Sequence, residues 1–386
     1  MKKMFAQLSV FLFLLNLFWY SQAFKSVPIY LYGSTVLVAI STLCYIDRRH
    51  WSRIALPSEI LWWILFGIYS FITGIVVAID RNLLFSSLIT YFVFLFVIAC
   101  IVIIIKGEGD IKWLLREIVI ITIICAIYTI FRGVDYYNGI FVRSMSLHNN
   151  PNSLGSLMVF GSFSLLYLSK PQIKALFYNT IILILFVYII ILTGSKKALL
   201  SEGILLSIWI WGFFKEMRHS ESLINRIYVY GLAIIFGGII AYYFLTDYIS
   251  TASFVRMQSL TTSGSTIARI DMYKEAFNMF KMSPLVGIGY NQFRVLSRYG
   301  SYSHATYSEL IADSGLFGTL IFMYPIIVTG KKLIMRNHFC NSYYKSILLG
   351  LYVIEIFLGA MNIFFYEFSH LLMWTIIFIL VDNQAC

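Results

Sequence analysis

Charged residues are scarce in this chain. Of its 386 residues, 12% are Asp, Glu, Lys or Arg, whereas 60% are hydrophobic. A soluble globular domain has about one quarter charged residues, so this composition excludes that class and indicates a protein embedded in a membrane. Cysteine is also scarce. The five cysteines are scattered without metal-ligand spacing, so they predict neither a metal site nor a disulfide framework.

The chain contains many long apolar runs. A helix of about 20 apolar residues crosses a bilayer, and about twelve such runs can be placed. Lipid allows only helices or a closed barrel, and uninterrupted runs such as Tyr91–Ile105 lack the alternation of barrel strands. We therefore expect an all-α polytopic membrane helix bundle, with residues 1–386 forming a single membrane domain. The runs are 4–23, 28–46, 58–79, 83–105, 114–131, 152–169, 174–193, 198–214, 227–246, 306–329, 343–363 and 367–381.

The positions of Lys and Arg predict the orientation of these runs. Most of these residues fall in the loops that are cytoplasmic if the N-terminus is cytoplasmic. This places both termini in the cytoplasm, and the long loop 248–305, between the ninth and tenth runs, outside. The net charge of +11 is then a topology signal rather than a footprint for nucleic acid, and we expect no nucleic-acid partner.

Three segments of the predicted outer face concentrate the polar chemistry. The first enters the sixth run, the second is a tight connection between the seventh and eighth runs, and the third is the long loop. Within that loop, residues 265–280 have a helical period, with Ile267, Ile270, Phe277 and Phe280 on one stripe. Such a helix can lie along the membrane surface with Arg269 facing the site.

In this order, the segments resemble the O-antigen ligase / O-antigen polymerase superfamily of bacterial surface-glycan enzymes. The resemblance covers residues 140–330. It rests on Arg143 with Asn150-Pro151-Asn152, on Thr193-Gly194-Ser195-Lys196, on Arg269 followed by Pro284-Leu285-x-Gly287-x-Gly289 and Phe293, and on His304-x-x-Tyr307 followed by Gly315-x-x-Gly318.

Two departures from the family pattern affect the expected activity. The hairpin carries Lys196 where Arg is usual, which keeps the charge but loses the planar fork that binds phosphate with two hydrogen bonds. Ligases often have a second His beside the position of His304, where this chain has Ser303 and Ala305. This second departure favours a polymerase over a ligase.

The resemblance implies a membrane glycosyltransferase that needs neither cofactor nor metal. Its donor would be an undecaprenyl-diphosphate-linked oligosaccharide at the outer face of the bacterial inner membrane, for lipopolysaccharide or capsule biosynthesis. A polymerase transfers the growing chain to a new lipid-linked repeat unit, and a ligase transfers it to lipid A core. Membrane lipid is a partner in either case, and a chain-length regulator protein is a further candidate partner.

Candidate site residues follow from that chemistry. Cleavage of a glycosyl–diphosphate bond builds negative charge that fixed cations stabilise, and the acceptor hydroxyl needs a base that works near neutral pH. We assign His304 as the base, Arg269 and Arg143 as diphosphate clamps, Lys196 and Lys197 as supporting cations, Arg294 and Arg298 as contacts to the acceptor sugar, and Tyr307 as a further substrate-binding residue.

Structural alternatives stay open for several of these positions. A His at the entrance of a span is often a capping residue, and Arg143 or Arg269 can extend to lipid headgroups. Glu309 and Asp313 lie one helical turn apart near the start of the tenth run. They are either functional intramembrane carboxylates or ordinary interface residues.

Two other function classes compete with this assignment. Twelve spans are common in transporters, but a carrier built from repeats should show two similar halves and polar groups at mid-membrane. This chain concentrates its polar groups at one face instead. A peptidoglycan polymerase of similar topology would need an essential Asp in the long loop, and Asp271 has no supporting pattern.

Overall fold

A computed structural model describes residues 2–20, 28–46, 56–108, 111–132, 136–137, 140–141, 151–169, 173–217, 231, 238, 264–335 and 342–383. Every predicted apolar run except 227–246 overlaps a described helix, and in that run only residues 231 and 238 are described. Among the described helices, Ser58–Val77, Arg81–Lys106, Lys112–Phe131 and Thr306–Met335 are long and apolar enough to cross a membrane. The predicted all-α polytopic membrane fold is therefore confirmed.

The chain forms two compact units, and each is described by itself. The first unit comprises Met1–Ala55, Ala99–Gly237 and Asn341–Ile354, and the second comprises Leu56–Ile98, Gly238–Cys340 and Glu355–Cys386. Each unit is therefore assembled from segments that are distant in sequence. The helices α5 (Arg81–Glu108) and α15 (Ser342–Gly359) contribute residues to both units.

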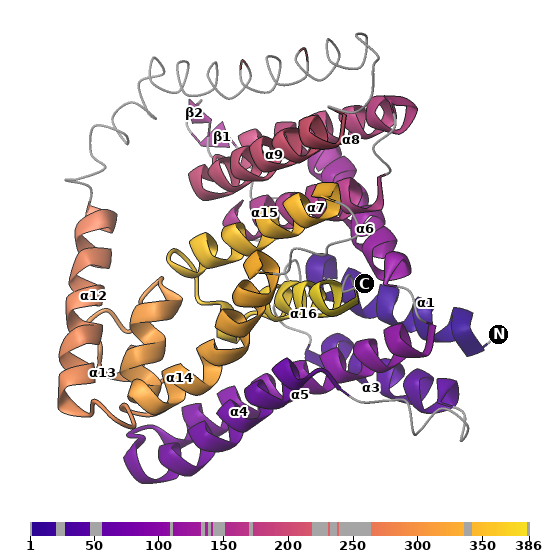
Figure 1. The fold of residues 1–386 in the computed structure, drawn as a ribbon. Helices are drawn as coiled ribbons and strands as arrows, with labels where there is room; N and C mark the ends of the chain where they lie inside the picture. The colour runs from indigo at the N-terminus through magenta and orange to yellow at the C-terminus, as the bar shows by residue number, and fades with distance from the viewer. Residues whose placement is uncertain are drawn as a thin grey trace. The chain divides into compact units, whose positions relative to one another are not determined.

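In the first unit, a buried helix is surrounded by its neighbours in sequence. This helix, α7, is buried from Leu154 to Tyr167, because α6, α8 and α9 pack on it (Figure 1). Small residues permit the close approach: a side chain at Gly161 would meet Thr122 of α6. The elements of this unit are α1 (Lys2–Leu15), a π-helical turn (Asn16–Tyr20), α3 (Pro28–Tyr45), α6 (Lys112–Arg132), β1 (Tyr136–Tyr137), β2 (Ile140–Phe141), α7 (Pro151–Leu168), α8 (Ile173–Thr193) and α9 (Lys196–Met217).

In the second unit, the helix α14 packs against α4, α12 and α16 (Figure 1). Its core is aromatic, with the ring of Phe66 in contact with those of Tyr290, Phe322 and Phe365. The elements of this unit, besides parts of α5 and α15, are α4 (Ser58–Val77), α12 (Gly264–Met282), α13 (Phe293–Leu296), α14 (Thr306–Met335), the short 3₁₀ helix η4 (Phe364–Tyr366) and α16 (Phe368–Asn383).

The helix α14 is interrupted at Gly315, which has φ 63° and ψ −167°. The turn after α12 docks at this break through backbone hydrogen bonds. The N–H groups of Ile288 and Gly289 donate to the carbonyls of Ala312 and Asp313 at 3.0 and 2.9 Å. In return, the N–H groups of Leu316 and Phe317 donate to the carbonyls of residues 284 and 285 at 2.9 and 3.2 Å. The break thus leaves backbone groups that the turn satisfies.

The two motif glycines of α14, Gly315 and Gly318, have different roles. Gly318 permits close helix approach, since a Cβ there would come within 2.6 Å of the Tyr69 ring of α4. Gly315 instead adopts a left-handed φ that ends one helical segment and begins another, a conformation that favours glycine.

The helix α12 confirms the helix predicted over 265–280 and shows which of its faces packs. Met272, Ala276 and Met279 are buried and join a hydrophobic cluster with residues of the following turn and of α14. Of the predicted stripe, Ile267, Ile270 and Phe277 are exposed, whereas Phe280 is half-buried. Its placement on a membrane surface stays a prediction.

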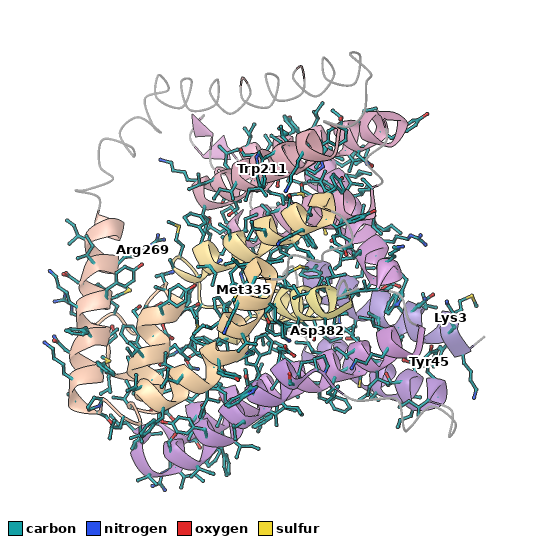
Figure 2. All side chains as sticks on the ribbon, viewed as in Figure 1. Lys3, Tyr45, Trp211, Arg269, Met335 and Asp382 are labelled. Atoms are coloured by element: carbon teal, nitrogen blue, oxygen red, sulfur yellow. The ribbon has the colours of Figure 1, made fainter. Side chains whose placement is uncertain are left out.

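Far along α14 from this docking site, an ion cluster joins three helices of the second unit. The ammonium group of Lys332 lies 2.8 Å from the carboxylate of Glu59 and 3.0 Å from that of Asp382. Figure 2 labels Asp382, near the end of α16, and Met335, the last residue of α14. The cluster connects α4, α14 and α16, and so fixes the scaffold that carries the candidate site.

Candidate active site

The residue expected to act as base lies in a constrained loop in front of α14. His304 has φ 61°, which is rare for a residue with a side chain. Its ring lies 4.4 Å from that of Tyr302, centroid to centroid. The preceding N–H, that of Ser303, donates to a carboxylate oxygen of Glu309 at 2.6 Å. The other oxygen of this buried carboxylate has no hydrogen-bond partner among the described residues.

The start of α14 is itself fixed to the segment before η4. The N–H and the hydroxyl of Thr306 donate to the carbonyl of Asn362 at 2.9 and 2.6 Å. That hydroxyl also accepts the N–H of Phe364 at 2.9 Å. A left-handed residue costs about 1 to 3 kcal/mol and persists only where its surroundings hold it. Here the surroundings of His304 are held on both sides.

Two of the arginines predicted to bind substrate, Arg269 and Arg294, share one electrostatic environment. Burial raises the pKa of Tyr302, and the nearby carboxylates of Glu367 and Glu309 raise it further. The guanidinium groups of Arg294 and Arg269 act in the opposite direction. Both cations therefore lie within electrostatic reach of the phenol that packs on His304.

Arg269 reaches this environment from α12. It lies one helical turn before Met272, on the side of the helix that packs in the second unit. Its side chain is exposed, and Figure 2 shows it in the N-terminal part of α12. An exposed arginine on the packing side of a helix can contact a ligand without losing a structural partner.

A second carboxylate of α14 organises the turn that carries Arg294. The carboxylate of Asp313 accepts the N–H groups of Asn291 and Phe293 at 2.7 and 2.9 Å, and the hydroxyl of Tyr366 at 2.8 Å. Only 1% of Asp313 is exposed. Glu309 and Asp313 thus act in the same way: each binds backbone N–H groups of a loop and holds it against α14.

Replacing Asp313 by Asn should lower the thermal midpoint of the detergent-solubilised protein. The NH₂ group of Asn would face N–H and O–H groups that are themselves hydrogen-bond donors. A buried donor without an acceptor costs about 1 to 3 kcal/mol. Tyr366→Phe is the matched control, because it removes one of the three donors and should cost less. Equal midpoints for Asp313→Asn and the wild type, by scanning fluorimetry, would show that this carboxylate does not hold the turn.

The other substrate-binding residues predicted in the second unit have partners of their own. The guanidinium of Arg298 is exposed and lies 2.8 Å from Asp271 and 2.9 Å from Glu275 of α12. The hydroxyl of Tyr307 donates to the carbonyl of Ile356 at 2.8 Å. Contacts of Arg298 and Tyr307 with substrate stay predictions.

In the first unit, two of the motif segments meet directly. The hydroxyl of Ser195 donates to the side-chain oxygen of Asn152 at 2.9 Å, which joins the start of α7 to the turn between α8 and α9. Gly194 in this turn has φ 58°. Lys196 and Lys197 are the first two residues of α9. Arg143 lies outside the described residues, so its role as a clamp also stays a prediction.

Comparison with known proteins gives one family. A family model described as O-Antigen ligase matches residues 181–323, from within α8 to within α14. This match supports an O-antigen ligase/polymerase-like superfamily. The matched region contains both lysines of the hairpin, Arg269 and His304, and Arg143 precedes it. No curated protein matches the chain.

The match supports the activity at a coarse level only. It supports a polysaccharide-related ligase or polymerase, a multi-pass membrane enzyme of glycosyltransferase type, with lipid-linked oligosaccharides as the implied substrates. The structure adds Glu309 and Asp313 as residues that position the candidate site. Their spacing of one helical turn at the start of an apolar run was visible in the sequence, but the backbone groups that they bind were not.

Proposed function

We propose that this protein is a polymerase of O-antigen-type or capsule-type polysaccharide. It transfers an undecaprenyl-diphosphate-linked glycan to a lipid-linked acceptor repeat unit at the outer face of the bacterial inner membrane. The observation that carries the proposal is the fixed, left-handed position of His304 beside Tyr302, within a region that matches the O-antigen ligase family. Strained residues cluster at active sites, where the strain holds a reacting group in place.

Each proposed residue has a defined part in the transfer. His304 accepts the proton of the acceptor hydroxyl as its oxygen forms a bond to the anomeric carbon of the donor. The bond from that carbon to the diphosphate oxygen breaks, and its electron pair leaves with undecaprenyl diphosphate. Arg269 stabilises the charge that develops on the diphosphate. Arg143, Lys196 and Lys197 keep their predicted roles as anion-binding groups.

The acceptor distinguishes the polymerase from the ligase. Ser303 and Ala305 flank His304, so the chain lacks the neighbouring His that favours the ligase. Deletion of the gene in a host with lipopolysaccharide should leave a single repeat unit attached to lipid A core, seen as one band above the core on a gel. Loss of all repeat units from the core would instead identify a ligase, or a carrier that supplies the substrate.

Complementation of this deletion strain tests Arg269. Arg269→Gln should lower the rate of chain extension about 100-fold to 1,000-fold, as expected for the loss of one preorganised donor, and Arg269→Lys should retain part of the activity. Lys274→Gln is the matched control, since Lys274 is an exposed cation on the same helix and lies 3.7 Å from Asp271. A wild-type ladder from Arg269→Gln, at equal protein level, would contradict the role of Arg269.

A further inference from the structure

The second unit contains a small pocket that the predicted site residues do not explain. It has a volume of about 130 Å³, and its lining includes Ser87 and Thr90 of α5, Asn291 and Arg294 of the long loop, and the rings of Tyr290 and Tyr366. The α5 residues precede the region matched by the O-antigen ligase family. The pocket is thus assembled from a motif segment and from a helix outside the motif.

Two polar atoms of this lining lack partners among the described residues. The side-chain oxygen of Asn291 is one, although only 4% of this residue is exposed and its amide nitrogen donates to Ser87 at 2.6 Å. The Nε atom of Arg294 is the other. A buried polar atom without a partner costs about 1 to 3 kcal/mol. The pair therefore indicates a ligand that offers both a hydrogen-bond donor and an acceptor.

The walls of the pocket are aromatic and held in place. The Tyr290 ring lies 5.2 Å from that of Tyr366 and 5.8 Å from that of Tyr91. The Tyr366 hydroxyl is bound by the Asp313 carboxylate, and Arg294 lies over the Tyr366 ring at 6.0 Å. Pockets of this composition bind small molecules with an apolar face and a few directed polar groups.

The size of the pocket and the charge beside it restrict the class of ligand further. The pocket, at about 130 Å³, is slightly smaller than the cavity of about 150 Å³ that holds one benzene ring, so a six-membered ring would lie only partly inside it. A hydroxyl group both donates and accepts, which matches Asn291 and Arg294. The carboxylate of Asp313 lies directly behind Asn291 and Tyr366 and disfavours a diphosphate.

We infer that this pocket is a subsite for one sugar ring of the acceptor glycan. A sugar hydroxyl donates to the side-chain oxygen of Asn291, and a ring or hydroxyl oxygen accepts from Arg294. The inference rests on the proposed function. Arg269 is the cation assigned to the donor diphosphate, so the acceptor is the substrate assigned to the pocket beside Arg294.

Steady-state kinetics in proteoliposomes test the subsite. The probes are lipid-linked polymer as donor and tritium-labelled single lipid-linked repeat unit as acceptor, both isolated from the host. Ser87→Leu fills the pocket and should raise the KM for the labelled unit about tenfold, with the KM for the polymer unchanged. Ser86→Leu is the matched control, because Ser86 is exposed on α5 and its hydroxyl bonds only within that helix.

If Ser87→Leu folds poorly, Arg294→Met provides a second test. The Nε atom of Arg294 makes no hydrogen bond with the described residues, so removing it breaks no such bond in the protein. Arg294→Met should also raise the KM for the labelled unit alone. A wild-type protein that incorporates no label contradicts the polymerase itself. If the wild type works and both variants behave like Ser86→Leu, the subsite is wrong. A rise only in the KM for polymer overturns the assignment to the acceptor.

Discussion

Replacing His304 by Asn should lower the turnover number of chain extension about 100-fold to 10,000-fold, the usual contribution of a positioned acid–base group. Asn is the substitution of choice because it tolerates the left-handed φ of 61° that this position requires. The loop should therefore keep its hydrogen bond from Ser303 to Glu309. Loss of activity then reports loss of the base rather than collapse of the loop.

Two further readouts separate a base from a structural residue. His304→Gly also accepts the left-handed conformation and leaves space, so added imidazole should restore part of its activity. The wild-type rate should fall toward acidic pH as the base takes up a proton. The residual activity of His304→Asn should not show this decrease at acidic pH. Turnover of His304→Asn at the wild-type rate would remove His304 from the mechanism.

The helices and the motif segments could be predicted from the sequence because each depends on local pattern. Apolar length gives the spans, and period gives the helix over 265–280, which the structure has as α12. The O-antigen ligase-like resemblance depends on residue order alone, and the family model matches residues 181–323, which contain Lys196, Arg269 and His304 but not Arg143. These features need no knowledge of which segments meet.

The contacts that hold the site could not be predicted, because they depend on how the loops before α14 fold back onto it. Glu309 and Asp313 were visible as a pair of carboxylates, but the loops that they bind lie on either side of α13 and become neighbours only in the folded unit. In the same way, the hydrogen bond from Ser195 to Asn152 explains why two separate motif segments occur together. A single sequence records both partners without recording their contact.

The pocket of the second unit likewise could not be predicted from the sequence. Arg294 was predicted to contact acceptor sugar because it is an outer-face arginine in the long loop. Nothing in the sequence connects it to Ser87, which lies in an apolar helix far upstream. The unpartnered atoms of Asn291 and Arg294, rather than residue type alone, distinguish Arg294 from Arg298, whose guanidinium is already paired with two carboxylates.

Replacing Gly287 or Gly315 by Ala should destabilise the protein more than any other single methyl addition discussed for this unit. Both residues have positive φ, 75° and 63°, which costs an alanine about 1 to 2 kcal/mol. A Cβ at Gly287 would also lie 2.4 Å from the carbonyl oxygen of Asp313, and one at Gly315 would lie 2.5 Å from the backbone of Leu285. Overpacking against backbone adds about 1 to 3 kcal/mol.

Gly300→Ala separates the cost of a positive φ from the cost of a clash with backbone atoms. Gly300 has φ 58°, but a Cβ added there would meet no atom within 4 Å, so its substitution carries the conformational cost without the clash. The thermal midpoint in detergent and the yield of monodisperse protein should therefore fall in the order Gly300→Ala, then Gly287→Ala or Gly315→Ala. Equal midpoints for Gly315→Ala and Gly300→Ala would show that the turn does not dock at the break in α14.

The double variant tests whether the two glycines serve one contact. A Cβ at either glycine would come within 2.6 Å of the backbone nitrogen of the other, so each substitution should separate the same turn from the same break in α14. Once the first has displaced the turn, the second has little left to disrupt, and residues in contact are not additive. The midpoint of Gly287→Ala/Gly315→Ala should lie well above the value expected from adding the two losses. Full additivity would mean that the motif glycines before and within α14 act independently, and so do not serve one contact.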